Sequence, residues 1–139
     1  MTAGTGTPGI RYSATLEGVS PAQIEGFFVG WQHPFSGEEH LRMLAGSDFT
    51  ELAIHEQSGR VVGFIGALSD GVQGAFITLL EVLPDYQGQG IGQGLMERML
   101  QQLSHIQTIE LMCDHDLIPF YQRFGMTPTN GMVLRRREP

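Results

Sequence analysis

The sequence contains no lysine, so all eight of its basic residues are arginines. Fifteen acidic residues outnumber them, which gives a formal net charge of −7 with the histidines neutral. Binding to nucleic acid depends on basic side chains that neutralise phosphates, and an acidic chain is poorly suited to it. Three of the arginines, Arg135, Arg136 and Arg137, form a short run typical of a solvated tail. We therefore expect no nucleic-acid partner.

Cysteine and long apolar runs are also scarce. Cys113 is the single cysteine, which rules out an internal disulfide, and no Cys/His cluster has the spacing of a zinc site. The apolar runs fall far short of the ~20 residues that span a bilayer. Residues 1–9 lack the basic and apolar regions of a signal peptide. We expect no metal, no membrane partner and a cytoplasmic location.

What the chain does contain is enough for one compact domain. Its 139 residues are 41% hydrophobic, and its mean hydropathy is −0.06. A chain of this length supports a single core and leaves no room for a second domain. Residues 1–9, rich in Gly and Thr, are expected to form a flexible tail, and residues 10–139 the domain.

Hydrophobic periodicity and turn residues predict an α/β, or layered α+β, arrangement. Ser20-Pro21 and the capping box formed by Ser36 and Glu39 each indicate the start of a helix. Alternating apolar and polar residues between turn residues indicate strands, and a single apolar stripe indicates a long helix at 91–103. The expected order is a strand at 10–16, helices from 20 and 36, strands at 49–56, 61–68 and 75–83, a helix at 91–103, a strand at 108–113, a short helix at 117–124 and a last strand at 132–136.

Glycines cluster between the third of these central strands and the long helix. The segment Gln87–Gly94 has glycine at every second position, although each glycine costs about 1 kcal/mol of helix stability relative to alanine. Successive amides without side chains can approach a phosphate at a helix N-terminus. A flexible loop is the alternative. The spacing does not fit Gly-x-Gly-x-x-Gly, and the Walker pattern needs a lysine that is absent.

The run Gln87-Gly88-Gln89-Gly90-Ile91-Gly92, preceded by Leu-Glu-Val-Leu-Pro, resembles the pyrophosphate loop of the GCN5-related N-acetyltransferase (GNAT) family. A second motif, Pro119–Met126, is similar to the late Phe-Tyr-x-x-x-Gly-Phe segment of that family. The resemblance covers the chain from about Ile10 and implies a central mixed, mostly antiparallel sheet flanked by helices. Two positions depart from the family: Met126 replaces a phenylalanine, and Asp114 replaces an asparagine that contacts the cofactor in many members.

The resemblance implies an N-acetyltransferase that moves an acetyl group from acetyl-CoA directly to the amine of a small molecule. Main-chain groups of two strand residues would face the acetyl carbonyl and the pantetheine arm, and the glycine loop would hold the pyrophosphate. Arg98 or Arg123 is a candidate for the outer phosphate. The expected cofactor-binding residues are Leu80, Val82, Gln87, Gly88, Gln89, Gly90, Ile91 and Gly92.

Two residues are expected to be catalytic. Tyr121 aligns with the family tyrosine that protonates the leaving thiolate; the alternative is a core aromatic. Glu81 lies in an apolar strand, where a carboxylate is costly unless it is paired or employed. It would serve as general base or hold a cationic amine, and the alternative is a buried salt bridge with an arginine. Cys113 is expected to be a small buried residue, and residues 114–116 solvated surface.

Two other functions remain open at this point: a non-catalytic acyl-CoA-binding regulatory domain, and an acetyltransferase of a protein N-terminus or lysine. The acceptor is expected to lie against residues 20–46 and 127–131, where Phe28, Trp31 and Phe35 suggest either an apolar wall or core packing. A homodimer is compatible with the resemblance, because members of the family often pair through their sheets.

Overall fold

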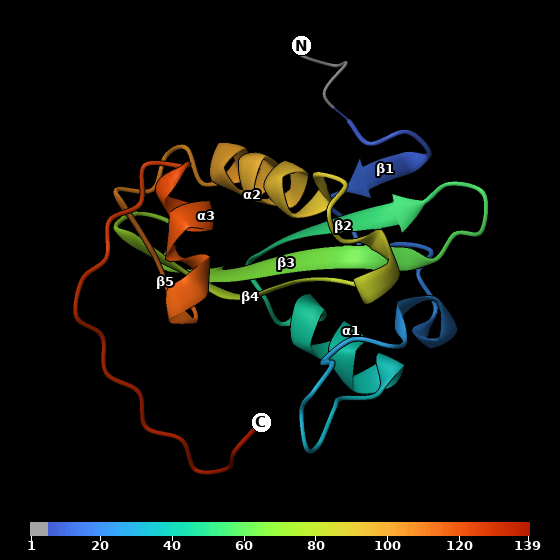
Figure 1. Ribbon diagram of the computed structural model, residues 1–139, viewed down its shortest axis with the longest axis horizontal. Coiled ribbons are helices and arrows are strands. Elements are labelled where there is room, and N and C mark those ends of the chain that lie inside the picture. The colour runs from blue at the N-terminus through green and yellow to red at the C-terminus, as the bar shows by residue number, and fades with distance from the viewer. Residues whose placement is uncertain (1–5) are drawn as a thin grey trace.

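The computed structural model describes residues 6–139 and contains one five-stranded sheet with the strands in sequence order. Each of the first four strands pairs antiparallel with the next one up to the fourth, and the fifth strand pairs parallel with the fourth. The mixed, mostly antiparallel sheet expected from the sequence is confirmed (Figure 1). The strands are β1 (Ile10–Ser13), β2 (Phe49–His55), β3 (Val61–Ser69), β4 (Gly74–Val82) and β5 (Thr108–Leu111).

Helices cover the two faces of this sheet. The long helix α2 (Ile91–Gln102) lies on one face, and α1 (Gly37–Ala45) lies on the other (Figure 1). The short helix α3 (Ile118–Gln122) follows β5 and stands beside it. A strand with helices on both faces must be apolar on both sides. All of β3 from Val61 to Ala67 is accordingly buried.

Neighbouring residues of β3 pack against the helices on opposite faces of the sheet. A Cβ at Gly63 of β3 would lie 3.0 Å from the side chain of Leu95, so the absence of a side chain lets α2 approach the sheet closely. On the other face, Phe64 packs against His40 of α1 with ring centroids 4.2 Å apart. The core therefore continues through the sheet from α2 to α1.

One predicted helix is wrong. The segment from Ser20 forms only a single 3₁₀ turn, η2 (Pro21–Ile24), because the chain then takes left-handed conformations at Gly26 (φ 93°) and Phe28 (φ 64°). Consecutive α-helical residues cannot include such positions. The apolar residues at helical spacing are instead folded inward by a loop, and Phe27 and Phe28 join the core.

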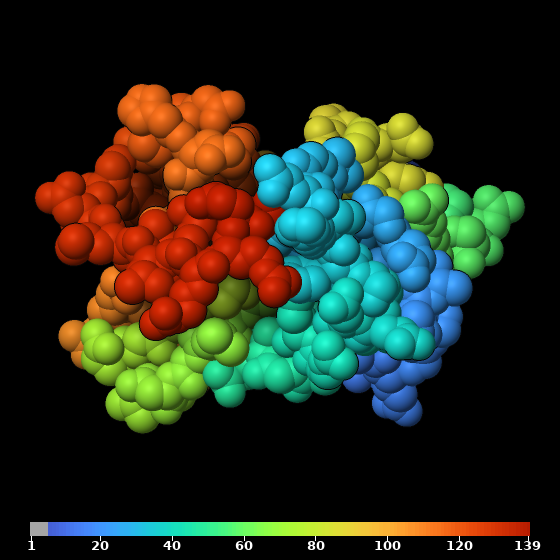
Figure 2. All heavy atoms as spheres, turned by 90° about the horizontal axis from the view of Figure 1, so that it is seen from below, coloured from blue at the N-terminus to red at the C-terminus, as the bar shows by residue number. Residues whose placement is uncertain are grey.

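The predicted last strand at 132–136 is also wrong. Met132 is 98% exposed, and this part of the chain adopts no regular structure. The C-terminal chain lies instead across the face of the molecule seen in Figure 2, and the Gln32 amide donates to the Pro139 carbonyl at 3.2 Å. A strand requires a neighbouring strand for its hydrogen bonds, and this segment lies beside none.

Two kinds of feature are absent from the described part of the chain. Within residues 6–139, no helix has the length and apolar character needed to cross a bilayer. In the same range, the acidic, histidine and cysteine side chains form no group of three or more arranged to hold a metal ion.

Candidate functional site

The sheet opens between β4 and β5. Their parallel pairing begins at Gly74 and Thr108 and stops where Ile77 faces Leu111, yet β4 continues to Val82. The last five residues of β4 therefore have their outer edge free of β5. A sheet edge exposes unpaired N–H and C=O groups, which can bind the backbone-like groups of a ligand.

The free edge presents the main chain of Leu80 and Val82. The Leu83 amide donates to the Val62 carbonyl of β3 at 2.9 Å. Peptide groups alternate in direction along an antiparallel strand, so those of Leu80 and Val82 face away from β3, toward the opening. The Gln87 side chain donates to the Val82 carbonyl at 3.0 Å and ties the following loop to this edge.

The glycine-rich loop connects the open edge to α2. Gly88 (φ 78°) and Gly90 (φ 85°) both take left-handed conformations, and Gly90 is the N-cap of α2 without a side chain to bond the first amides. A Cβ at either position would meet no atom within 4 Å, so steric crowding does not explain these glycines. The backbone conformation does, and it leaves the helix amides accessible to an anion.

The other two glycines of the run, Gly92 and Gly94, are explained by their neighbours and not by their backbone conformation. A Cβ at Gly92 would lie 3.8 Å from both Val82 and Phe120, in ordinary contact with the two sides of the opening. A Cβ at Gly94 would overlap the Tyr12 hydroxyl of β1, so this glycine serves packing. Only the part of the run before Gly94 therefore belongs to the candidate anion-binding loop.

The loop is also held from the N-terminal side. Thr7 donates its hydroxyl to the Gln89 carbonyl at 2.8 Å, and the Ile10 amide donates to the Thr7 carbonyl at 3.1 Å. Part of the segment expected to be a flexible tail thus contacts the loop, while residues 1–5 lie outside the described residues. The sequence offered no signal for this contact, because it joins residues 82 positions apart.

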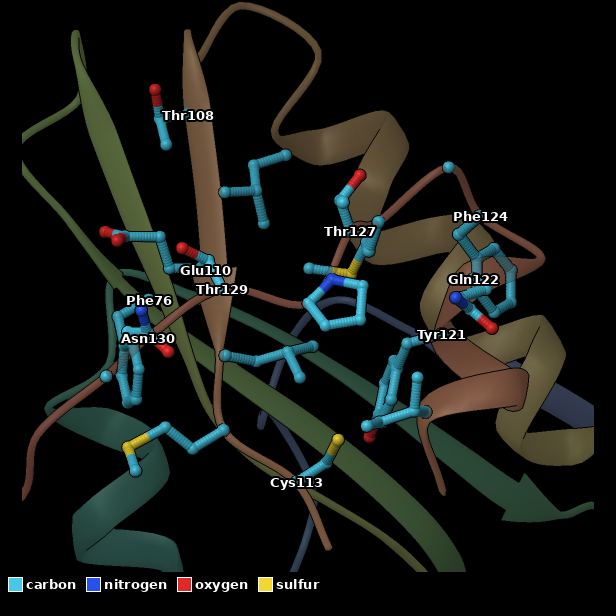
Figure 3. Close-up of a pocket in the computed structure, with 18 of the residues that line it drawn as sticks. Phe76, Thr108, Glu110, Cys113, Tyr121, Gln122, Phe124, Thr127, Thr129 and Asn130 are labelled. Atoms are coloured by element: carbon cyan, nitrogen blue, oxygen red, sulfur yellow. The ribbon is translucent and has the colours of Figure 1, made fainter. Parts of the chain in front are cut away.

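Tyr121 belongs to the short helix α3, whose Phe120 borders the glycine loop at Gly92. Its ring packs against Phe120 with centroids 5.0 Å apart. Burial, assisted by the nearby Cys113 thiol, raises the pKa of Tyr121 to about 12. Figure 3 shows the Tyr121 hydroxyl and the Cys113 sulfur directed toward one another. A phenol with this pKa stays protonated in neutral solution, so it can give up a proton but does not act as a phenolate base.

Both residues line a cavity of about 760 Å³ (Figure 3). Its walls come from β5, α3, Phe76 of β4 and the chain segment 124–132. The expectation that Cys113 is buried is wrong, because the residue is exposed and follows β5 where the sheet has ended. Residues 114–116 are exposed, as expected for solvated surface.

Glu81 has partners that were not expected. Its Oε1 accepts from the Phe28 amide at 2.9 Å, and its Oε2 accepts from the Phe28 and Val29 amides at 3.0 and 3.3 Å. Backbone amides thus take the place of the arginine considered from the sequence. An ionised carboxylate offers about four acceptor sites, so these three contacts leave about one for another donor.

The amides that Glu81 binds belong to a constrained loop. Phe28 is the single non-glycine residue with positive φ in the described part of the chain, and Gly26 and Gly30 beside it also have positive φ. Such conformations persist only where the surroundings enforce them, and the carboxylate is part of that enforcement. The paired glycines were the one sequence signal for this turn.

Three aromatic side chains extend from the same loop. The Phe28 ring lies 5.1 Å from both Trp31 and Phe35, and those two rings lie 5.9 Å apart. Phe28 is buried in the core, whereas Trp31 is half-buried and Phe35 is 37% exposed. Of the two expectations, core packing therefore applies to Phe28, and an accessible apolar wall applies to the other two.

The two arginines considered for an outer phosphate both lie over aromatic rings. The Arg98 guanidinium carbon is 3.9 Å from the centre of the Tyr12 ring, and that of Arg123 is 5.0 Å from the centre of the Phe120 ring. Such stacking orients a guanidinium without consuming its hydrogen-bond donors. Phe120, over which Arg123 lies, also borders the glycine loop at Gly92.

Comparison with known proteins agrees with this geometry. The model of the Acetyltransferase (GNAT) family matches residues 16–126. A crystallised chain from Deinococcus radiodurans assigned as an acetyltransferase is 43% identical, with a TM-score of 0.90 over 94% of this chain and 91% of its own. The uncharacterized N-acetyltransferase ycf52 of Gracilaria tenuistipitata is 36% identical over 75% of this chain. Serotonin N-acetyltransferase 2 of Oryza sativa is 31% identical over 84% of this chain and 60% of its own length.

The chain spans only part of its curated relatives. It covers 42%, 41% and 59% of the ycf52 proteins of Porphyra purpurea, Pyropia yezoensis and Gracilaria. The part that the family model matches contains strands β2 to β5, the glycine loop and the segment through Met126. With the family model matching most of the sequence, this chain belongs to the GNAT family of acetyltransferases.

Proposed function

We propose that this chain transfers an acetyl group from acetyl-CoA to the amine of a small molecule in one direct step. The observation that carries the proposal is the open edge of β4, which leads into the glycine loop, where Gly92 lies between Val82 and Phe120 of α3, the helix that carries Tyr121. The cosubstrate would supply the activated thioester. The chain's own groups would bind it, orient it and move two protons.

Binding rests on backbone groups. The loop from Gln87 to Gly92 offers amides at a helix N-terminus with open space around Gly88 and Gly90, which suits a pyrophosphate. The outward-facing main-chain groups of Leu80 and the Val82 amide suit the pantetheine amides and the acetyl oxygen. A donor aimed at the oxygen on which charge develops contributes about 2.7–4 kcal/mol to catalysis. The acidic chain thus binds phosphates with amides where other proteins would use lysine.

Proton transfer rests on two side chains. When the amine nitrogen bonds to the acetyl carbon, the nitrogen must lose a proton, and the C–S bond breaks to release a thiolate. The remaining acceptor site of Glu81 would take the first proton directly or through water. The Tyr121 hydroxyl would give its proton to the thiolate sulfur and be restored from solvent.

The acceptor is proposed to be a small amine with an apolar or aromatic substituent. Trp31 and Phe35 offer partly exposed rings beside the loop that Glu81 holds, and one relative is named for an aromatic amine. The experiment is a thiol-release assay with acetyl-CoA and a panel of arylalkylamines, polyamines, amino acids and peptides. We expect turnover with arylalkylamines to exceed that with the others. Fastest turnover with peptides would replace the small-molecule assignment with a protein acceptor.

A non-catalytic acyl-CoA-binding domain is the second candidate. Such a protein has no use for a proton donor near the opening, whereas Tyr121 in the proposed reaction is one. Intact acetyl-CoA binding in calorimetry, combined with no thiol release for any amine of the panel, would establish the regulatory role instead.

A further inference from the structure

The segment before β1 contacts the glycine loop through one side chain. Thr7 donates its hydroxyl to the Gln89 carbonyl at 2.8 Å, and its own carbonyl accepts from the Ile10 amide at 3.1 Å. The Gly9 carbonyl accepts from the Glu56 amide, just after β2, at 2.9 Å. The segment is therefore held at the sheet on one side and at the loop on the other.

The Thr7 contact sets the direction of one peptide group of the loop. The peptide bond between Gln89 and Gly90 is trans, and in a trans peptide the C=O and the N–H point in opposite directions. Because the carbonyl is turned toward Thr7, the Gly90 N–H must point away from the N-terminal segment. Within residues 6–139 this N–H donates to no backbone carbonyl, and the space around Gly90 is open. The Gly90 amide is thus available to an anion at the start of α2.

Tyr12 fixes the same segment to α2. Its hydroxyl occupies the space that a side chain at Gly94 would need, and the Arg98 guanidinium carbon lies 3.9 Å from the centre of its ring. Gly94 and Arg98 lie on one face of the helix, one turn apart. Burial raises the pKa of the Tyr12 phenol, and Arg98 and the Thr7 side chain partly offset that rise. Thr7 therefore reaches the loop from a base that is attached to α2 itself.

We infer that Thr7 is a positioning residue for the cofactor, because its hydroxyl holds the Gln89–Gly90 peptide in the orientation that presents the Gly90 amide to the pyrophosphate of acetyl-CoA. The inference rests on the proposed function, which assigns the pyrophosphate to this loop. A glycine-rich loop has many accessible conformations and loses entropy when it closes on an anion. A peptide that is oriented before the cofactor arrives reduces this loss. Thr7 acts through the loop, so it should affect affinity and not the chemical step.

The contact also couples the cofactor to the N-terminal segment. Binding free energies are reciprocal: if the Thr7 hydroxyl strengthens cofactor binding by some factor, the bound cofactor must strengthen the Thr7 contact by the same factor. The Ile10 amide donates to the Thr7 carbonyl, so its hydrogen exchange reports on this contact. The segment before β1 should therefore become more ordered when the cofactor binds.

The first test compares two substitutions of Thr7 by calorimetry with acetyl-CoA. Thr7→Val keeps the shape of the side chain and removes the hydroxyl, and we expect the Kd to rise about three- to ten-fold, the effect of one neutral hydrogen bond. Thr7→Ser keeps the hydroxyl and should bind nearly as wild type does. Thr15→Val is the matched control, because the Thr15 hydroxyl accepts from the Glu17 amide within its own turn. In steady-state kinetics, Thr7→Val should raise KM for acetyl-CoA and leave kcat unchanged.

The possible failures can be told apart. Wild-type affinity in Thr7→Val, or equal weakening in the valine and serine variants, would overturn the role of the hydroxyl while the proposed function stands. A lower melting temperature without a change in Kd would show that Thr7 only stabilises the fold. Wild-type protein that binds no acetyl-CoA would overturn the proposed function, and the inference with it.

The second test follows hydrogen exchange by mass spectrometry with and without acetyl-CoA. In wild type, the cofactor should slow exchange in a peptide that covers residues 6–12, and Thr7→Val should remove most of that protection. The turn at residues 69–74 is the internal control, because it lies at the opposite end of β4 from the glycine loop and should not respond. Exchange at residues 6–12 that the cofactor leaves unchanged in wild type would contradict the coupling.

Discussion

Tyr121 has a phenol that stays protonated in neutral solution, and its side chain lines the cavity. Its ring is half-buried and packs against Phe120, and burial is the main cause of its pKa of about 12. In the proposed reaction the leaving thiolate takes up a proton, and a phenol hydroxyl is a group that can donate one. The hydroxyl, not the ring, therefore carries the proposed role.

Tyr121→Phe removes only that hydroxyl. We expect kcat to fall at least ten-fold, because loss of a positioned general acid typically costs about 10²–10⁴ in rate. Affinity for acetyl-CoA in calorimetry should be unchanged, since the glycine loop is untouched. Tyr86→Phe, at a half-buried tyrosine that faces His55, is the control. Unchanged turnover in the Tyr121 variant would remove this residue from the mechanism.

His40 offers a prediction about stability. It is fully buried among Phe27, Phe28 and Phe64, and neither ring nitrogen has a hydrogen-bond partner within the described chain. Burial lowers the pKa of His40 from 6.5 to about 4. Between these values the unfolded chain binds a proton that the folded chain excludes, so the free energy of unfolding must decrease as the pH falls through this window.

The measurement compares urea unfolding at pH 7 and pH 4.5. The His40 contribution to the loss of stability approaches about 3 kcal/mol at the acid end of the window, from 1.36 kcal/mol per pKa unit. His40→Phe should therefore lose less stability on acidification than wild type, whereas His33→Phe, at an exposed histidine, should behave as wild type. Equal pH dependence in all three proteins would contradict the lowered pKa.

At the scale of elements, the glycine loop and α2 form one unit. Gly90 combines positive φ with open space, so the backbone conformation and the space for a ligand can be tested separately. Gly90→Asn tolerates the left-handed conformation but adds a side chain, and Gly90→Val adds both strain and volume. Gly125 has the same φ of 85° and the same open space outside the loop.

We expect Gly90→Val to abolish acetyl-CoA binding in calorimetry and Gly90→Asn to weaken it at least ten-fold. Gly125→Val should lose similar stability from the same strained conformation, yet retain binding. Normal affinity in Gly90→Val would show that the loop does not hold the cofactor. This outcome is readable even if both valine variants are less stable.

Glu81 joins β4 to the loop at Phe28, 53 residues earlier in the chain. In Glu81→Gln, a carboxylate oxygen that accepts from the backbone amides of the loop is replaced by an NH₂ group, which cannot accept. We therefore expect the melting temperature to fall. A hydrogen bond to a charged group contributes ~1.5–3 kcal/mol to the free energy of unfolding. Glu110→Gln, at an exposed carboxylate of β5, should leave it unchanged. An unaltered melting temperature for Glu81→Gln would mean that the carboxylate does not hold this loop.

Elements defined by local patterns were predictable. The strands β2 to β5 and the helix α2 follow from alternation, turn residues and one apolar stripe, all of which are written in neighbouring positions. The predictions at Ser20 and at 132–136 failed for non-local reasons. The first depends on a turn that Glu81 stabilises from a distant strand, and the second required a neighbouring strand.

The candidate site divides in the same way. The positions of the glycine loop at the start of α2 and of Tyr121 on a short helix after β5 were predictable from motifs. The exposure of Cys113 and the amide partners of Glu81 were not, because they depend on where β5 ends and how the Phe28 loop turns. A motif predicts which residue types follow one another in the sequence, whereas the hydrogen-bond partners and the exposure of a side chain depend on how distant segments pack together.

At the scale of the whole molecule, the charge of −7 creates a field that attracts cations. We expect KM for a cationic amine to rise with salt, because the Debye length falls from about 30 Å at 0.01 M to about 8 Å at 0.15 M. KM for a neutral amine of the same skeleton should change little. Steady-state kinetics at the two ionic strengths measures both, and parallel behaviour of the two amines would exclude steering by the field.

The exposed Cys113 has a practical consequence for enzymology. Reagents that report free CoA by forming mixed disulfides react with any accessible thiol, and this one lies in the cavity beside Tyr121. Each enzyme molecule would add one equivalent to the signal and then carry a bulky aromatic group against the proposed acid. Progress curves would begin with a burst unrelated to acetyl transfer and then slow. A Cys113→Ser background separates that artefact from true product release.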